Sequence, residues 1–77
     1  MPVKAYILVD ISTDVKTQEI LDKLNSISGV KTAEAVSGPH DIMVVVEAAD
    51  LKSLGDIVIS KVRTIEGVTK TITCCCV

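Results

Sequence analysis

The side chains best suited to chemistry lie in a short polar stretch at the middle of the 77-residue chain. It consists of Ser37, Gly38, Pro39, His40 and Asp41, and apolar runs precede and follow it. Because glycine and proline interrupt regular structure, the stretch predicts a tight turn between two strands. Asp41 could bind a ligand ammonium group at the end of the sheet. The alternative is a hairpin aspartate that only accepts hydrogen bonds from nearby backbone N–H groups.

A second polar pair lies near the end of the sequence. Thr71 and Thr73 are two residues apart, so both hydroxyls lie on one face of a strand. They could donate hydrogen bonds to a small carboxylate. The alternative is the ordinary preference of threonine for a half-exposed strand.

Other residue patterns give little support for catalysis. His40 and Asp41 are adjacent, and adjacent strand residues point to opposite faces, so they cannot easily share a proton. The sequence has no glycine-rich phosphate loop, no nucleophile signature and no metal-ligand spacing. We therefore expect no catalytic residue, no metal and no cofactor, and we predict that the protein is not an enzyme.

Three consecutive cysteines, Cys74, Cys75 and Cys76, form a poor framework for disulfide bonds. Cys74 and Cys76 would share a strand face and could bind a soft metal. The favoured interpretation is that small buried side chains end a strand and one thiol is exposed.

Composition limits the class of protein. Hydrophobic residues make up 48% of the chain, yet it contains one Tyr and no Phe or Trp, so the core must be aliphatic. Such a small chain is marginal alone, and a bare apolar sheet face favours an oligomer. The net charge of −2, scattered lysines and scarce aromatics argue against direct nucleic-acid binding. Without a signal peptide or an apolar run of about 20 residues, we expect no membrane contact and a cytoplasmic protein.

Hydrophobic periodicity predicts four strands and two helices. Residues 3–11 alternate, with one wholly apolar face. Residues 42–46 are uniformly apolar and should lie mid-sheet, covered on both faces. A helix is predicted at 14–27, with Ser12, Thr13 and Asp14 as candidate caps, and an edge strand is predicted at 30–37. A second helix should follow the cap Asp50, with an apolar stripe that runs from Leu51 to Ile65 and includes Ile59. The last predicted element is a strand at 68–77.

The two halves of the sequence resemble each other. The segment 27–30 (Ile-Ser-Gly-Val) corresponds to 65–68 (Ile-Glu-Gly-Val), and each glycine should end a helix. A repeated strand–helix–strand unit predicts the α+β, ferredoxin-like βαββαβ fold. This fold has an antiparallel four-stranded sheet with two helices on one face. Gly55, inside the second helix, has no expected role beyond close packing.

These motifs together resemble the effector-binding domain of the Lrp/AsnC (feast/famine) regulators. The likeness rests on the glycine–valine pair after each helix, the Gly-x-aromatic-Asp turn at 38–41, and the Gly-Val-x-x-Thr-x-Thr ending at 67–73. It covers residues 1–77 as one domain. One departure is His40, where the family has Tyr or Phe, and an imidazole there could make binding pH-dependent.

The resemblance implies a regulatory module that binds an amino acid or similar small effector between subunits. The positions that it assigns to the ligand site are Gly38, His40, Asp41, Thr71 and Thr73. It further implies a homodimer with a dimeric α/β-barrel-like assembly, which builds an octamer or decamer. Full-length Lrp/AsnC regulators would be partners, and a stand-alone form without the helix-turn-helix domain would not contact DNA. The alternatives are a small dimeric α+β barrel enzyme and a structural oligomer without a ligand.

Overall fold

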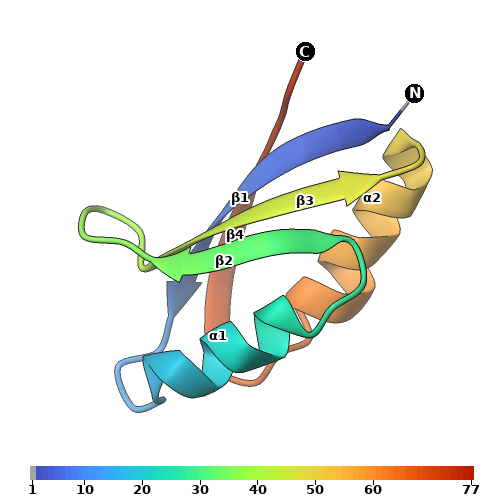
Figure 1. Ribbon diagram of the computed structural model, residues 1–77. Coiled ribbons are helices and arrows are strands. Elements are labelled where there is room, and N and C mark those ends of the chain that lie inside the picture. The colour runs from blue at the N-terminus through green and yellow to red at the C-terminus, as the bar shows by residue number, and fades with distance from the viewer. Residues whose placement is uncertain (1) are drawn as a thin grey trace.

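The computed structural model describes residues 2–77, which form a four-stranded sheet with two helices on one face (Figure 1). The sheet is antiparallel and has the order β2-β3-β1-β4. The predicted ferredoxin-like βαββαβ fold is therefore confirmed. In chain order the elements are β1 (Val3–Ile11), α1 (Thr17–Asn25), β2 (Val30–Ala35), β3 (Ile42–Ala48), α2 (Leu51–Ile57), its π-helical continuation η1 (Val58–Val62), and β4 (Val68–Cys75).

The core lies between the sheet and the helices. Alternate residues of the two central strands point toward the helices and are fully buried, as the apolar alternation predicts. Aliphatic side chains of both helices complete this core, as expected for a chain without Phe or Trp. The largest fully buried side chains are Ile7, Val9, Ile20, Leu24, Ile42, Val44, Val46 and Val62.

The opposite face of the sheet is uncovered. We call it the open sheet face; its central residues are Tyr6, Leu8, Met43, Val45, Ile72 and Cys74. Met43 is 38% exposed and Ile72 is 36% exposed, and both pair with Leu8 across the strands. The prediction that residues 42–46 are covered on both faces is therefore wrong for the single chain, because both helices pack on the same side.

The first helix is shorter than the predicted 14–27. It begins after Lys16, whose side chain makes no capping hydrogen bond. The Ser12 hydroxyl bonds to the Asp14 carboxylate, so these polar side chains bond each other instead of capping the helix. The last residue of α1 is Asn25, and Ser26 follows as the C-cap.

The second helix begins as predicted. The Asp50 carboxylate accepts a hydrogen bond from the Ser53 backbone N–H at 2.7 Å. This hydrogen bond, with a smaller contribution from the Ser53 side chain, lowers the pKa of Asp50 from its ordinary 3.8. Within residues 2–77, neither helix is long and apolar enough to cross a membrane.

Two glycines mark equivalent positions in the two halves. Gly29 and Gly67 both have φ of +99°, a conformation that side chains disfavour. A Cβ on Gly29 would lie 2.7 Å from Ile57 Cδ1, and one on Gly67 would lie 2.8 Å from Val15 Cγ1. The prediction that each glycine ends a helix is wrong, because α1 ends at Asn25 and η1 ends at Val62. Each glycine lies in the turn that follows its helix and packs against a side chain from the other half of the chain.

Candidate functional site

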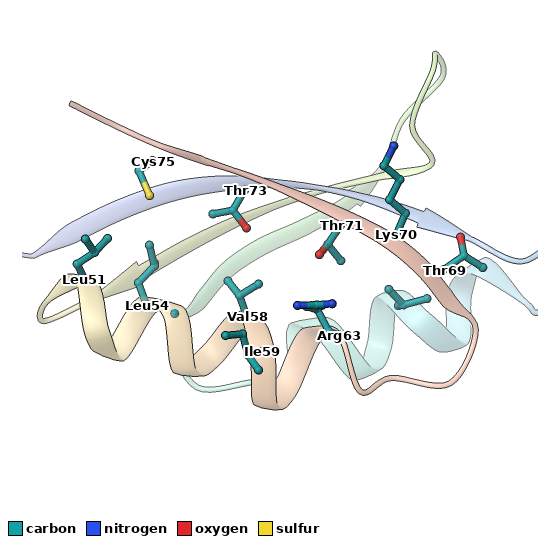
Figure 2. Close-up of a pocket in the computed structure, with 12 residues that line it drawn as sticks. Leu51, Leu54, Val58, Ile59, Arg63, Thr69, Lys70, Thr71, Thr73 and Cys75 are labelled. Carbon is teal, nitrogen blue, oxygen red and sulfur yellow. The ribbon is translucent and has the colours of Figure 1, made fainter.

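A groove of about 670 Å³ runs between the second helix and β4 (Figure 2). Its volume falls within the usual range for small-molecule sites. The helical wall consists of Leu51, Leu54, Gly55, Val58, Ile59 and Arg63. The strand wall consists of Val68, Thr69, Lys70, Thr71, Thr73 and Cys75.

The groove exists because the helix and the edge strand do not pack closely. Helix α2 packs mainly over β1 and β3, which leaves the helix side of β4 open. Thr71 pairs with Val9 and Thr73 pairs with Ile7, so both threonines lie on the same sheet face as the core. Their side chains point toward the helix (Figure 2). The predicted common face of the threonine pair is therefore confirmed.

The helical wall carries apolar side chains that the core does not use. Leu51, Gly55 and Ile59 recur every four residues and so follow one side of the helix. Leu51 is 63% exposed and Ile59 is 59% exposed. The prediction that both belong to a single buried stripe is wrong, because Leu54 and Val58 occupy the adjacent side and face the core.

Gly55 opens the middle of this wall. A Cβ built on Gly55 would meet no atom within 4 Å, in contrast to Gly29 and Gly67. Close packing within the chain therefore does not explain this glycine. Its missing side chain leaves space in the groove.

The charged side chains along the groove are cations. Arg63 follows the π-helical turn, where its N–H donates to the Val58 carbonyl at 2.9 Å. The Arg63 guanidinium points toward the strand wall that carries Thr71, whereas Lys70 points away from the helix (Figure 2). No carboxylate is among the described residues that line the groove. The geometry suits a ligand with an anionic group and an apolar body.

The predicted turn lies outside the groove and protrudes beyond the ends of β2 and β3 (Figure 1). Gly38 has φ of +148°, and a Cβ there would meet nothing within 4 Å. One Asp41 oxygen, Oδ2, accepts a hydrogen bond from the Ile11 N–H at 2.9 Å. His40 Nδ1 lies 3.0 Å from Asp10 Oδ1, and both side chains are partly exposed.

The structure thus divides the predicted ligand residues into two groups. Thr71 and Thr73 line the groove, whereas Gly38, His40 and Asp41 form the turn. β1 separates β3, which follows the turn, from β4. Within one chain, these five residues do not surround a common cavity.

The cysteines differ from the favoured prediction. Cys74, Cys75 and Cys76 are all exposed in the chain. Cys74 lies on the open sheet face, Cys75 lies on the uncovered helix side of β4, and Cys76 follows the end of the strand. Cys75 lines the apolar end of the groove. Among residues 2–77, no group of three or more His, Cys, Asp and Glu side chains is arranged to hold a metal ion.

Sequence reasoning missed Gly55 and Arg63 as groove residues. One signal was available: the apolar positions of the second helix fall into two stripes, 51-55-59 and 54-58-62, each with a four-residue spacing. One stripe is enough to cover the small sheet face beneath this helix, so the second stripe indicated apolar side chains outside the core. No comparable signal marked Arg63, because its position depends on the π-helical turn.

Comparison with known proteins identifies the family of this chain. Residues 4–77 match the model of the Lrp/AsnC ligand-binding domain. A hypothetical protein from Pyrococcus horikoshii, solved by crystallography, is 32% identical with a TM-score of 0.89, and the match covers 97% of this chain and 89% of that one. The fold is also that of Escherichia coli AsnC, at 24% identity and a TM-score of 0.89 over 97% of this chain and 50% of that one.

Curated relatives are longer proteins. An uncharacterized HTH-type transcriptional regulator of Pyrococcus furiosus is 35% identical over 71 residues, which are 90% of this chain and 47% of the regulator. A homocitrate synthase of Sulfurisphaera tokodaii is 38% identical over 71 residues, which are 92% of this chain and 15% of the enzyme. The chain thus spans about half of one relative and a small part of the other. On the match of residues 4–77, the chain belongs to the Lrp/AsnC family and constitutes its ligand-binding domain.

Proposed function

We propose that this domain binds an amino-acid effector and that binding changes its association with a regulatory partner. The groove carries the proposal, since it places two threonine hydroxyls and a guanidinium beside an apolar wall. Hydroxyl and guanidinium groups bind carboxylates, and the apolar wall suits a side chain. A regulator of the same fold from Neisseria meningitidis has been crystallised as a complex with L-Met, although it is only 17% identical to this chain.

The proposed site is completed between subunits. The turn residues Gly38, His40 and Asp41 would come from one subunit, and Thr71 and Thr73 from another. The support for this arrangement is that the turn protrudes while the groove is open, and that β1 separates them within one chain. Asp41 retains Oδ1 for a ligand ammonium group while Oδ2 holds the Ile11 N–H.

The open sheet face is the proposed dimer contact. Met43, Leu8 and Ile72 form an apolar row across three strands, and bare apolar sheet favours a second copy. Dimers would then assemble into an octamer or decamer. Effector binding between subunits would shift this assembly, because a ligand stabilises the state that it binds better.

The partner is proposed from the relatives. Similarity to an HTH-type regulator favours mixed oligomers with full-length Lrp/AsnC regulators, and hence a role in transcription without DNA contact by residues 1–77. Similarity to homocitrate synthase favours a second candidate, in which the domain controls a metabolic enzyme. Native mass spectrometry after mixing the chain with an AsnC-type regulator should show mixed oligomers under the first candidate.

The family is regulatory, which favours a non-enzymatic role over a small barrel enzyme. A cytoplasmic location is also part of the proposal, and three exposed free thiols fit a reducing compartment.

A thermal-shift screen of the twenty amino acids tests effector binding. A ligand at one hundred times its Kd should stabilise the domain by about 2.7 kcal/mol per site. A stable oligomer whose melting midpoint no amino acid changes would support the structural oligomer instead.

A further inference from the structure

We infer that the groove selects a carboxylate carried on an uncharged aliphatic chain, with Arg63 at the carboxylate and Gly55 making room for the chain. The inference deepens the proposed function, on which it rests for the identity of the effector as an amino acid. It names the effector class: amino acids with the side chains of valine, leucine, isoleucine or methionine.

The two ends of the groove differ in chemistry. Arg63, Thr69 and Thr71 lie at one end, and Leu51, Leu54 and Cys75 lie at the other (Figure 2). Leu51 and Arg63 are separated by roughly 18 Å of helix, from the 1.5 Å rise per residue. A ligand whose carboxylate lies at Arg63 therefore directs its remaining atoms along an apolar path.

The charges along the groove exclude other classes of effector. A basic side chain directed along the apolar path would lose water, and no carboxylate among the described residues that line the groove would pair with its cation. An acidic side chain that extended toward Leu51 would lose water without gaining a cation. An aliphatic side chain meets neither penalty, and its burial is favourable.

Gly55 is the position at which a substitution can test this selectivity. It stands between Leu51 and Ile59 on the groove wall, where a Cβ would meet open space. A larger residue at this position would fill the groove without disturbing the chain's own core. Ser60 is exposed on the same helical segment but does not line the groove, so Ser60→Leu is a matched control.

The experiment is a calorimetric titration of the folded oligomer with glycine, alanine, valine, leucine, lysine and glutamate. Affinity should rise by about fourfold for each methylene that is buried along the aliphatic series. Lysine and glutamate should bind more weakly than leucine by at least about tenfold, because their charges would be desolvated without a partner. Gly55→Leu should weaken leucine binding by at least about tenfold, whereas Ser60→Leu should leave it unchanged.

Two results would overturn the inference: lysine or glutamate binding as tightly as leucine, or Gly55→Leu binding leucine like the unaltered chain. Circular dichroism of each variant shows whether it folds. If Gly55→Leu does not fold, Gly55→Val replaces it, and the amino-acid series on the unaltered chain still decides.

4-Methylpentanoate separates this inference from the proposed function, because it has the carboxylate and aliphatic chain of leucine without the ammonium group. If no amino acid binds but 4-methylpentanoate does, and Gly55→Leu weakens it, the amino-acid function fails and the groove inference stands. If 4-methylpentanoate also fails to bind, the groove inference is wrong as well.

Discussion

The Asp41 carboxylate accepts a hydrogen bond from the backbone N–H of Ile11 at 2.9 Å, which ties the β2–β3 turn to the last residue of β1. The carboxylate therefore has a structural role in its own chain. The hairpin interpretation and the ligand interpretation of Asp41 are compatible, since each uses a different oxygen.

This double role predicts different effects for two substitutions. Asp41→Ala removes the acceptor for the Ile11 N–H and should lower the free energy of unfolding by about 1 kcal/mol, besides losing effector binding. Asp41→Asn keeps an acceptor oxygen, so it should preserve stability while losing the charge that pairs with an ammonium group. Urea unfolding and calorimetric titration of both variants check this. Full effector binding by Asp41→Asn would remove the charge of Asp41 from the site.

Replacing Gly29, Gly67 or Gly55 with alanine should change the free energy of unfolding in different directions. Gly29→Ala and Gly67→Ala should each lower the free energy of unfolding by at least about 1–2 kcal/mol, because φ is positive and the new Cβ meets a side chain. Gly55→Ala should raise it by about 0.5–1 kcal/mol, since this helical position is open. Urea denaturation of the three variants measures both signs. The packing argument fails if all three shift the midpoint in the same direction.

Leu8 should control assembly through the open sheet face. It pairs with Met43 on one side and with Ile72 on the other, and a charge there would be costly to bury against a second subunit. Leu8→Glu should therefore shift the species seen by light scattering from oligomer to monomer. Lys52→Glu, an exposed change on the second helix outside this face, serves as control. An intact oligomer with Leu8→Glu would place the dimer contact elsewhere.

The cap of the second helix should make a small contribution to acid sensitivity. In the folded chain, the hydrogen bond from the Ser53 N–H lowers the pKa of Asp50 below 3.8, the ordinary value that we expect in the unfolded chain. The stabilisation is thus complete above pH 3.8 and is lost as the pH falls through the lowered folded-state pKa. The variant Asp50→Asn also caps the helix but does not titrate at this position. Urea unfolding as a function of pH should show the stability advantage of the unaltered chain over Asp50→Asn shrinking in acid; an advantage that is constant with pH would contradict this assignment.

The fold could be predicted from the sequence because its signals are local. Alternating residues in β1, the cap at Asp50 and the repeated glycine–valine pairs each depend on neighbours in the chain. The start of α1 was missed because Ser12 and Asp14 bond each other, a competition among polar side chains that residue type alone does not resolve.

The candidate site was harder to predict because it depends on how far elements lie apart. The pattern placed Thr71 and Thr73 on one face, but it did not reveal that α2 leaves this face open. Leu51 and Ile59 have the periodicity of core residues, and only the position of the helix relative to β4 leaves them exposed. The relation of the turn to the groove involves more than one chain, which the residue pattern of a single chain does not encode.

A subunit-mixing experiment tests the proposed intersubunit site most directly. Asp41→Asn alters the turn but leaves the groove intact, and the double variant Thr71→Val, Thr73→Val alters the groove but leaves the turn intact. Each oligomer alone should fail to bind the amino acid found in the screen. Unfolding and refolding the two together should restore part of the binding, since some sites would pair an intact turn with an intact groove from different subunits. No recovery in mixed oligomers whose formation is verified by mass spectrometry, or full binding by either variant alone, would contradict the intersubunit site.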